Sequence, residues 1–301
     1  MGIFYASLAA FGFAFSYLMT RKGMLNSNYK NNIWEINSLS LLSALLFYLI
    51  ILLISGDDLS KELASINKSA IFLFLIDGLL GSFIGTVLGI VAIGQIGASH
   101  ASAIRGGANP LFAILLALIL LGERPGLHGY LGIALIIGGI LFIGLKNHEG
   151  ITSLLETKKM EGGVYALLSG FAFALANIAR GAAVQGGAPI NLGFFINISV
   201  GFLACSLISI YKRRSIYYLT RFSNKSLFYY VLSGAGILLG VVGLLRAYLY
   251  IPVWQALAIR NTQPVLVLLL SIIFVGWKEK VEVKMVAGII VVTAGAILVN
   301  L

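Results

Sequence analysis

Residues 103–110 read AIRGGANP and residues 258–264 read AIRNTQP, each within an otherwise apolar stretch. In both segments an arginine precedes an amide residue and a proline. A charge near the centre of a bilayer costs at least about 2 kcal/mol, so it usually faces a water-filled cavity. Proline removes a backbone N–H and frees a carbonyl that lipid cannot satisfy. Matching interruptions in two halves of a chain are typical of a transporter's binding site, and that is what these segments predict.

The composition is that of a membrane protein. The chain is 59% hydrophobic and 11% charged, with a mean hydropathy of +0.98, whereas a soluble domain is about 25% charged. Apolar runs of roughly 20 residues predict an all-α membrane protein with ten transmembrane helices and no soluble domain. We place these helices at residues 2–20, 33–54, 70–93, 99–121, 127–145, 163–185, 190–211, 227–250, 253–275 and 281–301.

The basic residues predict the orientation in the membrane. The net charge is +10, which we attribute to basic loops and not to a nucleic-acid partner. About fourteen Lys and Arg residues follow odd-numbered helices, while Lys61, Lys68 and Arg124 alone lie on the other side. By the positive-inside rule, the first side is cytoplasmic and both termini face outward. We therefore expect a multi-pass protein of the cytoplasmic membrane.

The two halves of the chain match each other. At an offset of 160 residues the first predicted helix matches the sixth, and at 155 residues the third and fourth match the eighth and ninth. An odd number of helices per copy forces the copies into opposite orientations. The sequence therefore predicts two inverted five-helix repeats, at residues 1–148 and 162–301, joined by a linker at 149–161. The matched pairs include Phe13 with Phe173, Gly81 with Gly236, Gly85 with Gly240, and Arg105 with Arg260.

These repeated motifs resemble the drug/metabolite transporter superfamily, specifically its ten-helix EamA-like members. The resemblance rests on Asn109 and Pro110, the LGER segment at 121–124 and a second copy from Gln263 to Glu279. It implies transport of small metabolites or drugs through a cavity lined by helices 1, 3, 4, 6, 8 and 9. Many members place both termini in the cytoplasm, unlike the charge bias here. Small multidrug members carry a Glu in their first helix, and residues 2–20 contain no acid.

Four arginines fall within predicted helices. For Arg105 and Arg260 we expect substrate contact, the alternative being a structural ion pair or a contact with freed carbonyls. Arg180 and Arg246 lie about one turn from helix ends, where snorkelling to the interface is the alternative to a role in the site. Asp77, in the third helix, has two open interpretations: it pairs with an arginine, or it carries a proton that couples transport.

Amides and aromatic residues near the interruptions are candidates to line the site. They are Asn109, Gln263, Asn177, Tyr17 and Trp254, and we assign them to substrate binding with Arg105, Arg260 and Arg246. The alternatives are interhelical hydrogen bonds and an interfacial aromatic belt. The spaced glycines predict close helix packing, within the monomer or in an oligomer.

The expected function is gradient-driven transport of a small metabolite by alternating access. The excess of arginines over acids favours a carboxylate- or phosphate-bearing substrate, such as an amino acid or organic acid. Alternatives are an exporter of drug-like or aromatic compounds and a lipid-phosphate flippase. We find no nucleotide motif, metal cluster or catalytic pair, so we expect no enzyme activity, cofactor or metal. The expected partners are the substrate, the bilayer and a proton or counter-substrate, in a monomer or weak dimer.

Overall fold

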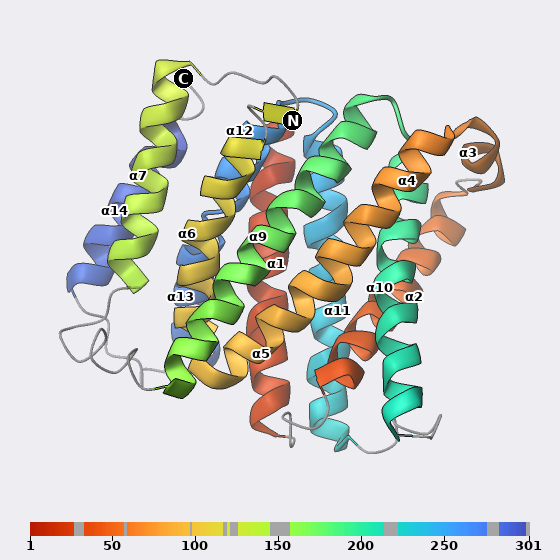
Figure 1. Ribbon diagram of the computed structural model, residues 1–301, viewed down its shortest axis with the longest axis horizontal. Coiled ribbons are helices and arrows are strands. Elements are labelled where there is room, and N and C mark those ends of the chain that lie inside the picture. Colours follow the sequence, from red (N-terminus) through yellow and green to blue (C-terminus); the bar gives the residue numbers. More distant parts are fainter. Residues whose placement is uncertain are drawn as a thin grey trace.

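The protein is a bundle of tilted helices in the computed structural model, which describes residues 1–26, 33–56, 59–96, 98–116, 119–120, 126–144, 157–213, 222–275 and 283–298 (Figure 1). No strand occurs among these residues, which confirms the all-α prediction. The helices are α1 (Gly2–Leu25), α2 (Ile33–Ser55), α3 (Leu59–Ser65), α4 (Lys68–Asp77), η2 (Gly78–Gly85), α5 (Thr86–Ile96), α6 (Ala98–Leu116), α7 (Leu127–Gly144), α9 (Thr157–Gln185), α10 (Ile190–Arg213), α11 (Asn224–Ala247), α12 (Val253–Arg260), α13 (Gln263–Val275) and α14 (Val283–Leu298).

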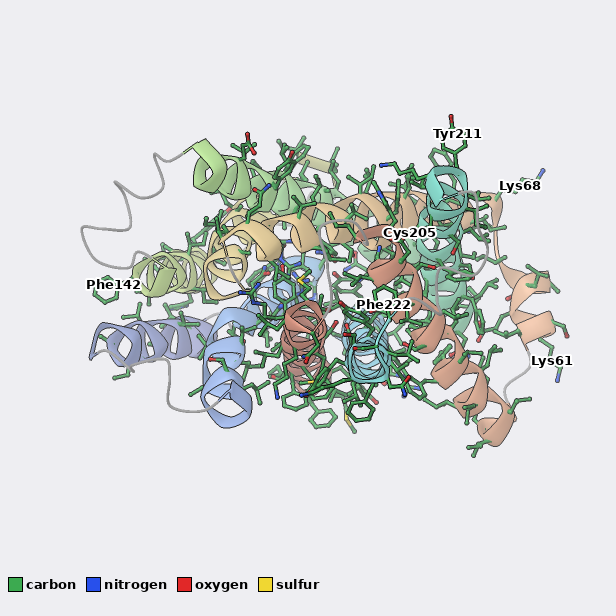
Figure 2. The ribbon with its side chains drawn as sticks, turned by 90° about the horizontal axis from the view of Figure 1, so that it is seen from below. Lys61, Lys68, Phe142, Cys205, Tyr211 and Phe222 are labelled. Atoms are coloured by element: carbon green, nitrogen blue, oxygen red, sulfur yellow. The ribbon has the colours of Figure 1, made fainter. Side chains whose placement is uncertain are left out.

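Six helices of the described chain are long and apolar enough to cross a bilayer. They are α1, α2, the continuous α4–η2–α5 helix, α9, α10 and α11. The other predicted spans correspond to α6, α7, α12 with α13, and α14, so the count of ten crossings remains a prediction. Apolar side chains such as Phe142 and Tyr211 project from the periphery, while Cys205 lies inside (Figure 2). An apolar periphery of this kind suits a lipid environment.

The two predicted proline interruptions differ in the structure. The ninth helix breaks as expected: α12 ends at Arg260 and α13 begins at Gln263. Asn261 N–H and the Thr262 hydroxyl donate to carbonyls of the last turn of α12, at 2.8 Å each, so the break leaves these acceptors satisfied. The predicted break in the fourth helix is wrong, because α6 continues through Pro110. Pro110 still lacks the N–H that would bond the carbonyl four residues earlier, so its helix has one bond fewer.

The third predicted helix contains a feature that the sequence analysis missed. Between α4 and α5 the chain forms η2, eight residues of π-helix that contain three glycines. The wider π turn changes which side chains face inward above and below it, and such segments are frequent at functional sites. Asp77 precedes η2 directly, and Ser82 lies within it.

Equivalent helices of the two halves make equivalent contacts. Helix α1 packs along α11, and its counterpart α9 packs along α4–η2–α5. These two counterparts run in opposite directions, α1 downward and α9 upward in Figure 1, as inverted repeats require. Likewise α6 packs on α9 and α13 on α1, while α2 packs on α10 and α11, and α7 on α14. The α7–α14 pair stands at one end of the bundle in both views (Figures 1 and 2).

The repeated glycines account for the closeness of these contacts. A Cβ added at Gly236 would lie 2.7 Å from Gly12 O, and one at Gly240 would lie 2.7 Å from the Phe13 ring. In the other half, a Cβ at Gly85 would lie 3.0 Å from the Phe173 ring. Phe13 and Phe173 are equivalent in the two repeats, as are Gly240 and Gly85. The glycines therefore allow close helix packing within the monomer, which was one of the two alternatives, the other being an oligomer interface.

Candidate functional site

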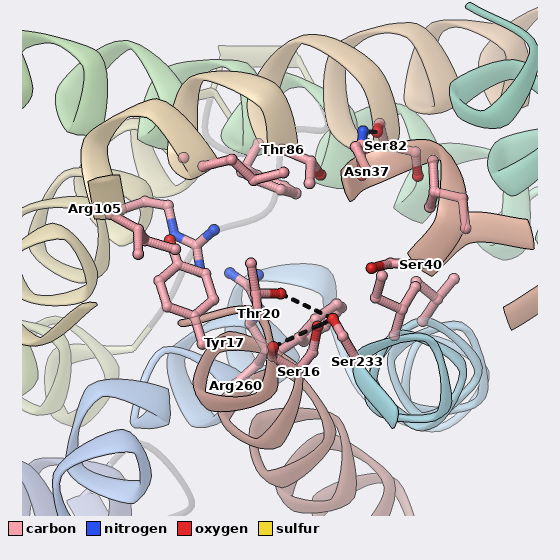
Figure 3. A pocket seen from close by; sticks show the side chains of 18 of the residues that line it. Ser16, Tyr17, Thr20, Asn37, Ser40, Ser82, Thr86, Arg105, Ser233 and Arg260 are labelled. Atoms are coloured by element: carbon pink, nitrogen blue, oxygen red, sulfur yellow. Dashed lines mark hydrogen bonds between the residues drawn. The ribbon is translucent and has the colours of Figure 1, made fainter. Parts of the chain in front are cut away.

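A buried cavity of about 70 Å³ lies at the centre of the bundle (Figure 3). Residues of α1, η2, α5, α6, α9, α11 and α12 line it, which agrees with the helices that the family resemblance implied. Helix α2 also contributes, through Asn37, Ser40 and Leu41, and this was not expected. A cavity of this volume has room for several water molecules or a small solute.

Three arginines of the described chain line this cavity, Arg105, Arg180 and Arg260, and the first and last of them come from equivalent positions of opposite repeats. Arg105 of α6 and Arg260 of α12 are 6% and 2% exposed. The Arg260 guanidinium carbon lies 4.7 Å from the centroid of Phe13, and that of Arg105 lies 5.0 Å from the centroid of Phe173. Because both residues of each pair are repeat equivalents, the site keeps the two-fold relation of the chain. Such a stack holds a desolvated guanidinium in place and contributes roughly 1–2 kcal/mol.

The cavity breaks this symmetry around Arg105. The Arg105 guanidinium carbon lies 4.2 Å from the Tyr17 ring, and Nη2 donates to Gln263 Oε1 at 3.3 Å. Arg260 instead donates to its neighbour Asn261 at 3.1 Å. The Asn261 amide also approaches Asn109 Oδ1, at 3.5 Å. The structure thus brings together both arginines, Asn109, Gln263 and Tyr17, while their role in substrate binding remains a prediction.

Several polar atoms of these residues have no partner within the described chain. They are Tyr17 Oη, Asn109 Nδ2, Asn177 Nδ2, Arg260 Nε and Gln263 Nε2. All but the hydroxyl are N–H donors only. Moreover, no carboxylate of the described residues lies within 4.0 Å of Arg105 or Arg260. Buried donors without acceptors cost free energy. Because Tyr17, Asn177 and Arg260 line the cavity, it is a donor-rich site suited to an anion or to water.

Asp77 and Arg180 form the one ion pair between described residues deep in the bundle. Arg180 Nε and Nη2 each donate to a carboxylate oxygen of Asp77, both at 2.8 Å. The two side chains are 1% and 3% exposed. Snorkelling therefore does not describe Arg180, because its guanidinium points inward to the acid. Of the two interpretations of Asp77, pairing with an arginine describes the geometry, while proton transfer remains a prediction.

The other half of the molecule replaces this ion pair by hydroxyl groups. Thr20 stands at the offset of 160 residues from Arg180. Ser233 Oγ lies 2.9 Å from Thr20 Oγ1 and 2.9 Å from Ser16 Oγ, joining α1 to α11 (Figure 3). The sequence analysis did not single out these three hydroxyls. Their spacing on one face of α1, with Phe13 and Tyr17, was the signal that could have found Ser16 and Thr20.

Four predicted site residues do not line the cavity. Asn109 and Gln263 contact residues beside it, since Gln263 Oε1 accepts from Arg105 and Asn109 Oδ1 lies near the Asn261 amide.

Arg246 and Trp254 lie at the end of the bundle. Arg246 is exposed at the end of α11, with its guanidinium carbon 5.8 Å from the Tyr5 ring. The interfacial alternative describes its position, because the side chain extends along the surface. Trp254 faces a shallow outer depression with Gln185, Tyr248 and Tyr250. It belongs to the aromatic residues near the end of the bundle, which the belt interpretation anticipated.

The described residues contain no cluster of three or more potential metal ligands. Glu123 and Glu279, for which we expect structural roles at helix starts, lie outside the described residues.

Comparisons with known proteins agree with this architecture. The model of the EamA-like transporter family matches residues 1–145 and again residues 160–301. A solved structure titled "Crystal structure of protein" superposes with a TM-score of 0.72, covering 97% of this chain and 95% of that chain at 14% identity, which shows a shared fold. A search of curated proteins finds no match. With two matches that together span nearly its whole length, the chain belongs to the EamA-like transporter family of multi-pass membrane transporters.

Proposed function

We propose that the protein is a secondary transporter of a small anionic metabolite, one that carries a carboxylate or phosphate group. One observation carries the proposal: Arg105 and Arg260 share a buried cavity in which no described carboxylate neutralises them. Arg180, by contrast, has Asp77 as its counter-ion. The cavity therefore has two positive charges to offer a ligand.

The energetics of burial support an anionic ligand. Each guanidinium buried without a counter-ion loses several kcal/mol of hydration. A carboxylate or phosphate oxygen that accepts from these donors returns about 1.5–3 kcal/mol per charge-assisted hydrogen bond. Substrate binding at the interface of two inverted repeats fits alternating access, in which each half moves around a fixed site. An amino acid or an organic acid of a few carbon atoms matches the size of the cavity.

The remaining expectations belong to the same proposal. The protein lies in the cytoplasmic (inner) membrane, and the side with the excess of basic residues faces the cytoplasm. Transport is driven by a gradient, and Asp77 is the candidate proton carrier, while exchange against a second solute is the alternative.

Export of drug-like aromatic compounds is the competing function, because Phe13, Tyr17 and Phe173 line the cavity. The two arginines lie over these rings, at 4.2–5.8 Å from their centroids. A ring face covered by a guanidinium is not available to stack on an aromatic ligand. Because the guanidiniums cover these ring faces, an anionic substrate is favoured over an aromatic one.

Transport into liposomes tests the choice. The purified protein is reconstituted, and uptake of labelled succinate, phosphate, L-serine and the aromatic cation ethidium is compared with protein-free vesicles. We expect uptake of at least one anion and none of ethidium. Uptake of ethidium without uptake of any anion would contradict the proposal and favour the drug exporter.

A further inference from the structure

The cavity has two chemically different sides. Arg105 and Tyr17 stand at one side in Figure 3, while Ser40, Ser233 and Asn37 stand at the other. The first side offers cationic donors, as described above. The second side consists of hydroxyl and amide groups, and its hydrogen bonds determine what else a ligand must carry.

Three side-chain donors of the second side are already used within the protein. Ser82 Oγ donates to Asn197 Oδ1 at 2.7 Å, and Thr86 Oγ1 donates to Gly81 O at 2.9 Å. Asn37 Nδ2 donates to Ser82 O at 2.8 Å. A ligand that reaches this side therefore meets few free donors.

Acceptors, in contrast, remain. Asn37 Oδ1 and Ser40 Oγ have no partner in the described chain. Ser233 Oγ donates to Ser16 O at 3.3 Å, so the Ser16 and Thr20 hydroxyls can both donate to Ser233. With these three hydrogens used, the Ser16 and Thr20 oxygens keep free lone pairs. The Ser40 hydroxyl can donate or accept, whereas Asn37 Oδ1 and the Ser16 and Thr20 oxygens are left to accept, so the ligand group that binds this side must be able to donate.

Two kinds of donor occur in small anionic metabolites: the ammonium of an amino acid and the hydroxyl of a hydroxy acid. An ammonium bound in this cavity is repelled by both guanidiniums, and this repulsion weakens its binding because the effective dielectric constant in a protein is well below that of water. No carboxylate among the described lining residues offsets that repulsion. A hydroxyl donates without charge.

We propose that the substrate is a small hydroxylated anion, whose carboxylate or phosphate binds Arg105 and Arg260 and whose hydroxyls bind the acceptor side formed by Ser16, Thr20, Asn37 and Ser40. This inference rests on the proposed function and narrows its substrate class away from α-amino acids.

Four small probes separate the contributions of the negative charge, the hydroxyls and an ammonium to binding. Glycerate has a carboxylate and two hydroxyls, propionate lacks the hydroxyls, L-serine has an ammonium in place of one hydroxyl, and glycerol lacks the charge. Equilibrium binding to the purified protein is measured by titration calorimetry. We expect glycerate to bind roughly tenfold tighter than propionate, because each hydroxyl adds a hydrogen bond. We also expect glycerate to bind tighter than L-serine and glycerol not to bind.

Ser40→Ala is the most direct variant, because the Ser40 hydroxyl has no partner in the described chain and its loss strands none there. Glycerate affinity should fall roughly three- to fivefold while propionate affinity stays unchanged. Ser206→Ala is the matched control, since Ser206 makes a buried 2.8 Å hydrogen bond with Ser38 between α2 and α10, outside the cavity lining. Ser233→Ala removes the hydroxyl that joins Ser16 and Thr20. It should also lower the affinity for glycerate and leave the affinity for propionate unchanged.

Several results would overturn the inference. Equal affinities for glycerate and propionate, or tighter binding of L-serine, would leave an anion site without hydroxyl selection. Equal loss of both acids in Ser40→Ala and Ser233→Ala would make these hydroxyls structural. Failure of every anion to bind would refute the proposed function itself and the inference with it.

Discussion

Removing the carboxylate of Asp77 is expected to destabilise the folded protein strongly. In Asp77→Asn the side chain keeps its shape, but Arg180 retains a buried charge without a counter-ion. The pair is 1% and 3% exposed and makes two 2.8 Å hydrogen bonds, so the variant loses a partner that bulk solvent does not supply. Breaking such a pair from one side costs about 3–5 kcal/mol. Unfolding by SDS in mixed micelles measures the free energy of unfolding directly.

The double variant Asp77→Asn/Arg180→Gln is the matched control. Because both charges are removed together, it should recover most of the loss, leaving a coupling energy of at least about 2 kcal/mol in the double-mutant cycle. A single Asp77→Asn variant within about 1 kcal/mol of the natural protein would refute the reasoning that this ion pair is desolvated.

The same variants test whether Asp77 couples transport to a proton gradient. If Asp77 carries a proton, the double variant should lose uphill accumulation driven by a pH gradient in liposomes, while downhill exchange remains measurable. Normal uphill accumulation would exclude Asp77 from coupling and leave it as the structural partner of Arg180.

Three further predictions concern packing, the cavity and topology. Gly236→Leu should abolish the monodisperse folded fraction in size-exclusion chromatography, because its Cβ would lie 2.7 Å from Gly12 O, whereas Gly126→Leu, which has open space around it, should not. Gly89→Val should fold but lower anion uptake roughly tenfold, since a Cβ there already lies 3.3 Å from Ser169 Oγ and 3.4 Å from Tyr17 Oη; unchanged uptake would contradict it. A reporter that is active only outside the cytoplasm should be active when fused after Leu301, and a silent fusion would reverse the orientation.

Much of the fold followed from hydrophobic length and internal repetition. The repeat match of Arg105 with Arg260, and of Phe13 with Phe173, anticipated that equivalent residues of the two halves meet at one site. The break before Gln263 was also predictable from Pro264. The same reasoning wrongly predicted a break at Pro110. A proline within a packed membrane helix removes a backbone hydrogen bond but does not have to end the helix.

The partners of individual polar residues could not be predicted. The sequence offered four arginines for Asp77, and the choice of Arg180 depends on how α4 and α9 are rotated against each other. The π segment after Asp77 changes that rotation, and its glycines alone do not predict it. Trp254 was assigned to the site because it lies near an interruption along the chain, and Arg246 because it is one of four arginines within predicted helices. In space they lie at the outer end of the bundle.

The hydroxyl side of the cavity was missed for a different reason. Ser and Thr are common in membrane helices, where they usually bond to neighbouring helices. Ser16, Thr20 and Ser233 do so as well, and only the cavity beside them distinguishes them from other serines.

The most direct test of the anion site is the affinity of a bound anion in Arg105→Gln, Arg260→Gln and Arg246→Gln. Each cavity variant should weaken binding roughly ten- to a hundredfold, the equivalent of one charge-assisted hydrogen bond, with the protein still folded. Lysine at either cavity position should restore part of the affinity, because it keeps the charge but not the planar pair of donors. Arg246→Gln, outside the cavity, should bind as the natural protein does. Unchanged affinity in both cavity variants would contradict the account and leave Arg105 and Arg260 as structural residues.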